Sequence, residues 1–393
     1  MPRILIVGAG IAGDTLAVSL DRLGWEVVVV EIAPGLRSGG QTVDLRGTST
    51  GVLSRLGLLE RCRAQLVPQR GIAWVSADGR RLAAMPVEAF GGAGFVSSDE
   101  LLRTDLARII HAAGSDRIEY RWSDTVESID DSGETVRVTF RSHDPETFDF
   151  VVGADGTHSR TRGIILGPEE TFRRPLGLAH AWFTLTETAS TPPLEGWFMV
   201  HNAPGSRVIE ARPGHPGTQE IGFSFAASAL PARQDREAQQ ALVDATFSGL
   251  GWRTQELLAA MPEAADFALD TFDQIEIDTW HSGRVVLLGD SAWCASPLSG
   301  LGTALALQGA ETLARELTAA AASPIPDWSE AFSRYERAMR PATTKARKLL
   351  PGRVRSYAPR TARGITAVAG IMKAAQNPAF DRLVTRIGAN RGH

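Results

Sequence analysis

The chain is poor in cysteine and has no long apolar run. Among its 393 residues only Cys62 and Cys294 carry thiols. Two thiols are too few for a disulfide framework, which favours a reducing compartment, and we expect a cytoplasmic protein. No basic segment followed by an apolar stretch opens the chain, so we expect no secretory signal. No apolar run reaches the roughly 18 to 20 residues that span a bilayer, so we expect no stable membrane insertion.

The net charge of the chain is small, but the charged residues are unevenly distributed. The formal net charge is −4, yet the segment from Ser333 to the C-terminus holds 14 Lys or Arg against two acids. A basic tail can bind nucleic acid or an anionic membrane. A helix that crosses the acidic body of its own protein is the simpler interpretation. We therefore expect no nucleic-acid partner, and a monomer or weak dimer.

The first residues predict a strand, a helix and a second strand in the order that binds dinucleotides. An apolar strand runs into the glycine-rich segment GAGIAG, and a helix follows it. In this spacing Gly8 permits a tight turn, Gly10 lets phosphates approach the backbone, and Gly13 lets helix and strand pack closely. Helix N-termini attract phosphate. We expect the pyrophosphate to bind at Gly8, Gly10, Ile11, Ala12 and Gly13.

The end of the second strand selects among dinucleotides. The strand EVVVVE ends at Glu31, and Ile32 follows it. A carboxylate there accepts hydrogen bonds from ribose hydroxyls and repels a 2′-phosphate. FAD and NAD therefore fit this site, whereas NADP does not.

Later segments return to the nucleotide-binding pattern. Asp155 follows a buried strand, and a further strand from Arg284 leads to Gly289-Asp290 and a long helix of small residues. A helix is expected from Ser98 to about Ala113, and another from about 360 to 387. Between about 177 and 278, strand-like segments alternate with Pro and Gly turns, which indicates an inserted sheet.

Two further motifs carry a resemblance. Residues 150–162 read FVVGADGTHSRTR, and residues 284–314 read RVVLLGDSAWCASPLSGLGTALALQGAETLA. Together with GAGIAG they resemble the three fingerprints of flavoprotein aromatic hydroxylases of the p-hydroxybenzoate hydroxylase fold. The loop from Arg37 to Leu45 (R-x-x-G-G-x-x-x-D-L) is similar to that of tetracycline-inactivating flavin monooxygenases. The resemblance covers about residues 1–350.

The resemblance implies an α/β fold. A three-layer, Rossmann-like FAD-binding domain would hold an inserted β-sheet substrate domain, with C-terminal helices after it. We predict that the FAD domain comprises 1–70, 96–172 and 279–325, and that the substrate domain comprises 71–95 and 173–278. The basic C-terminal helices would span 326–393.

The resemblance also implies which residues hold FAD. Asp290, after Gly289, would accept hydrogen bonds from the ribityl chain. The loop residues Pro297, Gly300, Leu301, Gly302 and Thr303 would bring backbone amides to the flavin. The remaining cofactor residues implied are Arg37 (for the nicotinamide dinucleotide phosphate), Asp44, Arg103 and Asp155, with Arg162 either ligating or holding its motif.

Three positions depart from the family pattern. Trp293 stands where the family often has His, Ala304 where it often has Asn, and Gly309 where it often has an acid. Backbone contacts to the flavin do not need these side chains. The local polarity around the ring is what the departures put in doubt.

The implied chemistry belongs to the cofactor. NAD(P)H would reduce FAD, and O₂ would add to give a C4a-hydroperoxide that inserts one oxygen into an aromatic or polyketide-like molecule of secondary or antibiotic metabolism. NADPH and NADH both stay open. An FAD oxidoreductase of the same fold without oxygen insertion is the alternative. No metal is required, and no side chain is assigned as catalytic.

Substrate residues are expected on the inserted sheet, over the flavin. Alternation places His180 and Trp182 on one face, and Phe223 and Phe225 on one face. Aromatic residues usually serve a core, but a pocket lined by them suits a flat ligand. We predict substrate contacts at His180, Trp182, Arg207, Phe223, Phe225 and Pro297; His201 is a weaker candidate.

Overall fold

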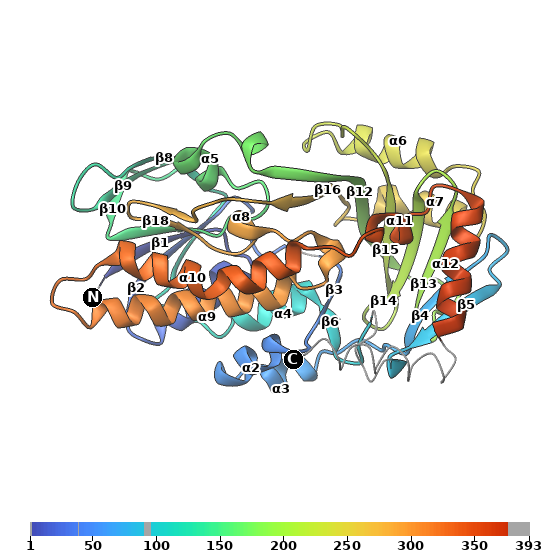
Figure 1. The fold of residues 1–393 in the computed structure, drawn as a ribbon, viewed down its shortest axis with the longest axis horizontal. Coiled ribbons are helices and arrows are strands. Elements are labelled where there is room, and N and C mark those ends of the chain that lie inside the picture. The colour runs from blue at the N-terminus through green and yellow to red at the C-terminus, as the bar shows by residue number, and fades with distance from the viewer. Residues whose placement is uncertain (1, 38, 90–95, 376–393) are drawn as a thin grey trace.

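Two large sheets lie at opposite ends of an elongated molecule. The computed structural model describes residues 2–37, 39–89 and 96–375 (Figure 1). A six-stranded sheet occupies one end, in the order β17-β18-β11-β1-β2-β7, and a seven-stranded sheet the other, in the order β16-β12-β15-β14-β13-β4-β5. Short paired strands and several helices connect the two sheets.

The six-stranded sheet is parallel except for its edge strand β17. Its strands are β1 (Arg3–Val7), β2 (Glu26–Glu31), β7 (Glu119–Trp122), β11 (Phe150–Gly153), β17 (His281–Ser282) and β18 (Val285–Leu287). The central strands are apolar almost throughout because both faces are covered. This sheet is therefore the middle layer of three.

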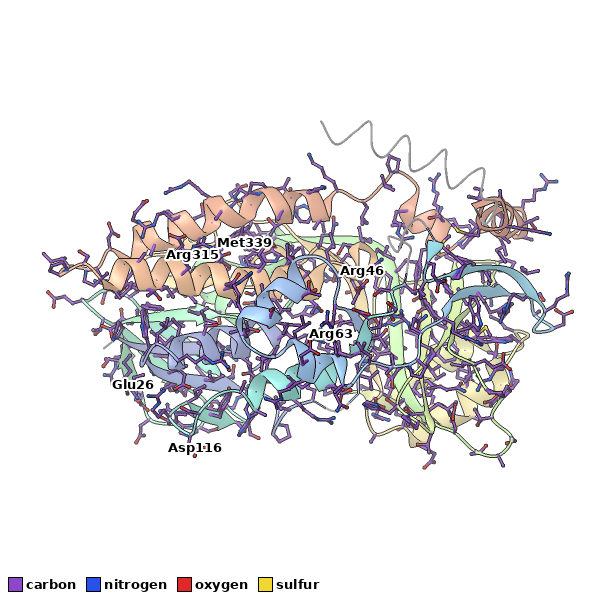
Figure 2. The ribbon with its side chains drawn as sticks, turned by 90° about the horizontal axis from the view of Figure 1, so that it is seen from below. Glu26, Arg46, Arg63, Asp116, Arg315 and Met339 are labelled. Atoms are coloured by element: carbon purple, nitrogen blue, oxygen red, sulfur yellow. The ribbon has the colours of Figure 1, made fainter. Side chains whose placement is uncertain are left out.

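The two covering layers differ in kind. On one face lie β8 (Val126–Asp130), β9 (Val136–Phe140) and β10 (Glu146–Phe148). On the other lie α1 (Ile11–Asp21), α9 (Gly302–Ala321) and α10 (Trp328–Arg347). Figure 2 shows α9 and α10 side by side, with Arg315 on the first and Met339 on the second. The predicted three-layer α/β fold is confirmed.

The seven-stranded sheet carries helices on its outer face. Its strands are β4 (Gly71–Val75), β5 (Arg81–Pro86), β12 (Arg173–Thr186), β13 (Trp197–Ala203), β14 (Arg207–Pro213), β15 (Thr218–Ala226) and β16 (Ala268–Ile275). Helices α6 (Arg236–Phe247) and α7 (Thr254–Ala260) bury one face in a core with residues such as Phe183. The opposite, inner face is joined by the segment after α10, which includes α11 (Arg353–Tyr357) and α12 (Ala362–Ala375) (Figure 1).

Smaller elements connect these units. They are β3 (Thr42–Asp44), β6 (Glu100–Leu102), α2 (Thr48–Arg55), α3 (Leu59–Arg63), α4 (Arg103–His111), α5 (Arg160–Leu166) and α8 (Asp290–Trp293), with three short 3-10 turns among the residues that the structure describes. The helix expected from Ser98 is wrong at its start, because residues 100–102 pair with β3 and the helix begins only at Arg103. Tertiary pairing outweighs the capping signal at Ser98.

Three sequence predictions concern the C-terminal helix, the domain boundaries and membrane-spanning helices. The helix expected over about 360–387 is observed over Ala362–Ala375, and the rest of that range lies outside the described residues. The domain boundaries stay predictions, although each large sheet takes its strands from only one of the two predicted sets of segments. Among the helices of 2–37, 39–89 and 96–375, none is long and apolar enough to cross a membrane.

Candidate active site

The carboxyl ends of three neighbouring parallel strands form the base of the candidate cofactor site. In the register, Val7 of β1 lies beside Gly153 of β11, and Gly153 lies beside Leu287 of β18. The three sequence motifs leave the sheet at this edge, so segments far apart in sequence meet there. Ligands of open α/β sheets bind at such strand ends.

The glycines of this edge have two distinct tasks. Gly8 has φ of 107°, and a Cβ there would lie 2.6 Å from the carbonyl oxygen of Ala154. A Cβ at Gly13 would collide with the carbonyl of Gly8, which confirms that α1 packs close to β1. By contrast, a Cβ at Gly10, Gly300 or Gly302 would meet no atom of the described residues within 4 Å. The open space at these three glycines is consistent with the predicted approach of a ligand to their backbone.

Glu31 is held in place at the end of β2. Its carboxylate accepts hydrogen bonds from the backbone N–H of Ala9 and of Ala33, both at 2.9 Å. Carboxylate oxygens have further lone pairs, which stay available to ribose hydroxyls. Ile32, the next residue, is 54 % exposed.

The charged side chains of Arg37, Arg103 and Asp290 lie near one another. Burial raises the pKa of the Asp290 carboxyl, and the Arg103 charge and a hydrogen bond from Cys294 oppose that rise. Although solvent reaches Arg103, the surrounding protein lowers its pKa; Asp290 opposes that change and Arg37 adds to it. Arg103 begins α4 and Asp290 begins α8. The fold thus brings Arg103 close to Asp290 and to Arg37, and all three are implied cofactor residues. Asp44 instead pairs with Arg46 at 2.5 Å.

The loop from Ser296 to Thr303 presents backbone to the same region. Ser296 adopts φ of 74° and Gly300 φ of 65°, so the chain turns sharply around Pro297. Pro297, Gly300, Leu301 and Gly302 are exposed, and the 20-residue helix α9 begins at Gly302. The first N–H groups of a helix have no partner within it and carry partial positive charge. This loop fits an electron-rich ring edge such as that of a flavin.

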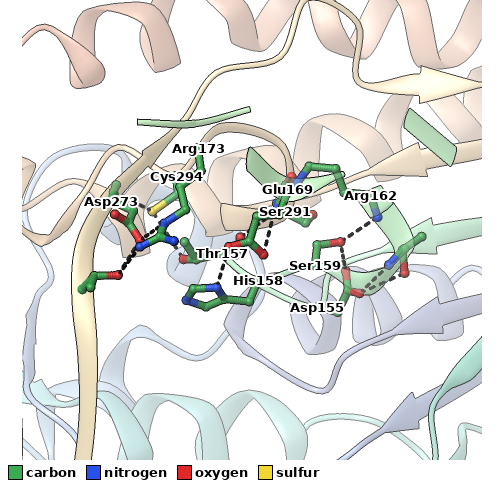
Figure 3. A network of polar contacts seen from close by, with 12 residues as sticks. Asp155, Thr157, His158, Ser159, Arg162, Glu169, Arg173, Asp273, Ser291 and Cys294 are labelled. Atoms are coloured by element: carbon green, nitrogen blue, oxygen red, sulfur yellow. Dashed lines mark hydrogen bonds and ion pairs between the residues drawn. The ribbon is translucent and has the colours of Figure 1, made fainter. Parts of the chain in front are cut away.

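The second motif is held by its own side chains. Asp155 accepts hydrogen bonds from the Ser159 hydroxyl at 2.5 Å and from the Thr161 backbone at 2.9 Å (Figure 3). The fully buried Arg162 donates to the carbonyls of Ser291, at 3.1 Å, and Thr157, at 2.8 Å. Arg162 thus ties the second motif to the third, and of the two roles considered for it the structure favours the holding role.

His158 joins the second motif to the seven-stranded sheet. One ring nitrogen contacts Glu169 at 2.9 Å (Figure 3). The other contacts Asp270 of β16 at 3.1 Å. Burial lowers the pKa of His158, but the hydrogen bond and charge of Asp270 outweigh it and the net pKa is raised. The imidazolium is therefore the form that this site stabilises.

We expect this contact to make stability depend on pH. A His with a raised pKa stabilises the fold fully below its unfolded pKa of about 6.5, and that contribution is lost as pH rises through the folded pKa. His158→Gln should cost about 1 kcal/mol at pH 5.5 and clearly less at pH 9, measured by denaturant unfolding. An equal cost at both pH values would contradict an ionic role.

Trp293 and Gly309 depart from the family pattern together. Trp293 is buried and packs on Trp280, with ring centroids 4.6 Å apart, and on Tyr335. A Cβ at Gly309 would lie 2.8 Å from the Trp293 ring. The indole therefore fills the space that a larger side chain at 309 would need. The two departures therefore depend on each other: the large side chain at 293 requires glycine at 309.

The inner face of the seven-stranded sheet lies against the loop from Ser296 to Thr303. Leu298 of that loop belongs to the same apolar cluster as Phe198 and Phe272. His180 and Trp182 lie on this face, with their rings stacked 5.8 Å apart. Burial, with a smaller contribution from the Arg212 charge, lowers the pKa of His180 to about 3. The structure thus brings His180 and Trp182 to the side of the sheet where the substrate is expected.

Three predicted substrate residues lie elsewhere and need correction. Phe223 and Phe225 pair with Ala181 and Ala179, so their side chains share the outer face and are packed against Phe247 of α6. Arg207 donates to the carbonyls of Pro204 and Thr246, also on the α6 side. The alternation was right, but a sequence does not say which face of a sheet receives the helices. His201 is on that outer face too, bonded to the Val75 carbonyl.

Several polar residues on or against the inner face were missed. Among them are Gln41, Glu210, Arg212, Ser224 and Tyr357. Arg212 lies over the Phe198 ring at 4.2 Å and donates to Glu100 at 3.0 Å. Alternation along β14 (Val208, Glu210, Arg212) was the one available signal, since charged residues at alternate positions of a buried strand are unusual.

The fold and the site define a dinucleotide-binding flavoprotein. A family model described as "FAD binding domain" matches residues 2–343, and the chain belongs to this family. It is 35 % identical over 325 residues to the FAD-dependent monooxygenase asL4 of Sarocladium schorii, covering 80 % of this chain and 75 % of that protein. It is 33 % identical over 343 residues to a flavin-dependent monooxygenase of Legionella longbeachae, covering 86 % and 85 %.

A solved structure agrees with this assignment. The tetracycline destructase Tet(51) superposes with a TM-score of 0.79 at 28 % identity, covering 96 % of this chain and 98 % of that chain. The chain is a flavin-dependent monooxygenase, as the resemblance implied.

Proposed function

We propose that this monooxygenase uses NAD(P)H and O₂ to hydroxylate an aromatic or polyketide-like small molecule. The observation that carries the proposal is the inner face of the seven-stranded sheet. It offers the rings of Trp182, Phe198 and Phe272 beside the buried polar groups His180 and Glu210. Apolar walls with a few polar groups suit a flat ligand that carries oxygen substituents. The name of Tet(51) as a tetracycline destructase supports a polycyclic substrate.

The residues of the cofactor site would hold FAD in an extended form. The amides near Gly10 and the N-terminus of α1 would receive the pyrophosphate, Glu31 the adenosine ribose, and Asp290 the ribityl chain. The N-terminus of α9 would face the ring. When bound, FAD supplies hydride acceptance and oxygen activation. The protein orients the substrate and excludes water.

The proposal also covers the nicotinamide cofactor, the cellular setting and the oligomeric state. Arg37 lies beside Arg103, so its charge suits the additional phosphate of NADPH. Both cysteines are free and buried, which fits a reducing, cytoplasmic setting. The proposed substrate class would place the enzyme in secondary or antibiotic metabolism. We propose that the protein acts as a monomer or weak dimer.

The test is product mass under labelled dioxygen. The purified FAD-loaded protein is mixed with NADPH or NADH and, in turn, with 1-naphthol, alizarin and tetracycline. We expect at least one compound to accelerate NADPH oxidation and to gain one labelled oxygen, with peroxide release measured alongside. Turnover of a compound without gain of labelled oxygen would favour an oxidoreductase that inserts none. NADPH oxidation that yields only peroxide with all three would count against this substrate class.

A further inference from the structure

A continuous chain of hydrogen bonds crosses the inner face of the seven-stranded sheet. His180 Nδ1 lies 2.7 Å from Ser224 Oγ, and Ser224 Oγ lies 2.7 Å from Tyr357 Oη. Tyr357 Oη donates to Glu210 Oε1 at 3.1 Å. At the other end, the amide nitrogen of Gln41 contacts His180 Nε2. Strands β12, β15 and β14 and helix α11 each contribute one member.

The donors in this chain all point one way. Tyr357 has a single hydroxyl hydrogen, which it gives to Glu210, so Ser224 must donate to Tyr357. Ser224 then accepts from His180, and Nδ1 therefore carries the ring proton. Nε2 is left as an acceptor, and it meets the Gln41 amide nitrogen. The neutral ring thus presents an acceptor nitrogen toward Gln41 and donates toward Ser224, on the side of Glu210.

The surroundings suit proton movement through neutral groups to the Glu210 carboxylate at the end of the chain. His180 is 3 % exposed and Glu210 is 8 % exposed. Burial raises the pKa of Glu210, opposed by the Arg212 charge and the Tyr357 hydrogen bond. Burial also raises the pKa of Tyr357, whose nearest charges are Glu210 and Arg353, so its hydroxyl keeps its proton at rest. The other packed element, β16, contributes the apolar Phe272. It also places Asp270 opposite His180 in the strand register, and the Asp270 carboxylate is paired with His158 and Arg233.

We propose that His180, Ser224, Tyr357 and Glu210 form a proton relay that deprotonates a hydroxyl group of the substrate. The proposal rests on the proposed function and narrows the substrate class to phenols and enols. The substrate hydroxyl takes the donor position that the Gln41 amide now occupies. Because Tyr357 lies beyond residue 343, where the family match ends, the relay depends on a segment outside the shared domain.

The step balances without an oxidant or reductant. The substrate O–H bond breaks and its proton bonds to His180 Nε2, while the Nδ1 proton moves to Ser224. The Ser224 proton moves to Tyr357, and the Tyr357 proton to Glu210 Oε1. The result is a substrate oxyanion and a neutral Glu210. A phenolate or enolate is richer in electrons than its conjugate acid, which favours attack on an electrophilic oxygen, and the reverse transfer restores the product hydroxyl.

The first test removes one hydroxyl. Tyr357→Phe keeps the ring against Phe272 but interrupts the relay. With whichever of the three phenolic compounds is turned over fastest, kcat should fall by about 10²-fold below the solution pKa of its hydroxyl. Above that pKa the rate should recover, because the substrate arrives already ionised, and KM should change little. Tyr120→Phe is the matched control, since Tyr120 also donates to a carboxylate, that of Asp14, and should keep the wild-type profile.

A loss of equal size at every pH would overturn the relay and leave a structural role for Tyr357. If none of the compounds is turned over by the wild-type protein, the proposed function fails, and the relay is then judged by a second measurement. Nitrogen NMR of the FAD-loaded, histidine-labelled protein should show His180 neutral with the proton on Nδ1. A proton on Nε2, or an imidazolium near neutral pH, would reverse the donor order and sink the proposal.

Discussion

The Gly10→Asp variant should fold normally and lose FAD. A Cβ at Gly10 would meet no atom of the described residues within 4 Å, and the backbone there is extended, with φ of −85°. Asp is also a favourable N-cap, so α1 should keep its stability. Its carboxylate would nevertheless occupy the place of the pyrophosphate and repel it. We expect FAD affinity to fall by more than about 100-fold, or about 2.7 kcal/mol.

The measurement is fluorescence titration of the apoprotein with FAD, with thermal unfolding of the apoprotein as the check on folding. Gly10→Asn is the matched control, because it has nearly the same size and no charge. Its affinity should fall less than that of Gly10→Asp, and the difference reports the electrostatic part. An Asp variant that still purifies yellow, with FAD bound at wild-type affinity, would place the phosphates elsewhere.

Arg162→Ala should destabilise the protein by about 3–5 kcal/mol, a large part of the 5–15 kcal/mol that typically separates folded from unfolded states. Arg162 is fully buried, and its removal leaves the Ser291 and Thr157 carbonyls without their donor and opens a cavity. The denaturant midpoint of the FAD-loaded protein measures the effect. The exposed Arg160 is the control, two positions earlier on the same helix.

Arg160→Ala should change the free energy of unfolding by no more than about 0.5 kcal/mol. Similar midpoints for the two variants would show that the buried guanidinium is not what joins the second motif to the third. Because Ser291 directly follows Asp290, we also expect Arg162→Ala to weaken FAD binding.

Local chemistry explains why the cofactor half of the molecule was predictable. The turn at Gly8, the helix after it and the acid at Glu31 are decided within about thirty residues by backbone geometry and charge. The strand-end motifs at Asp155 and Asp290 follow apolar runs, and parallel strands in one sheet place their carboxyl ends together. Family, fold class and the use of FAD therefore followed from short segments.

The inner face of the second sheet shows where such reasoning stops. Alternation correctly placed His180 and Trp182 on one face of the sheet. Phe223 and Arg207, also predicted to contact the substrate, instead face α6. Which face is covered depends on where α6 and α7 pack, and those helices come after the strands in sequence. A period of two defines two faces and leaves both equally eligible for burial.

The glycine motif, the acid of β2 and the family were determined by the sequence alone, because each is carried by short motifs whose backbone geometry and charge follow from neighbouring residues. The tertiary structure alone decided three other features. The Trp293 ring packs against Gly309, and Asp155 and Arg162 form hydrogen bonds that hold the second motif. Tyr357 forms hydrogen bonds with Ser224 and Glu210. Each of these joins positions whose spacing in the chain carries no signal, since side-chain contact depends on packing between elements.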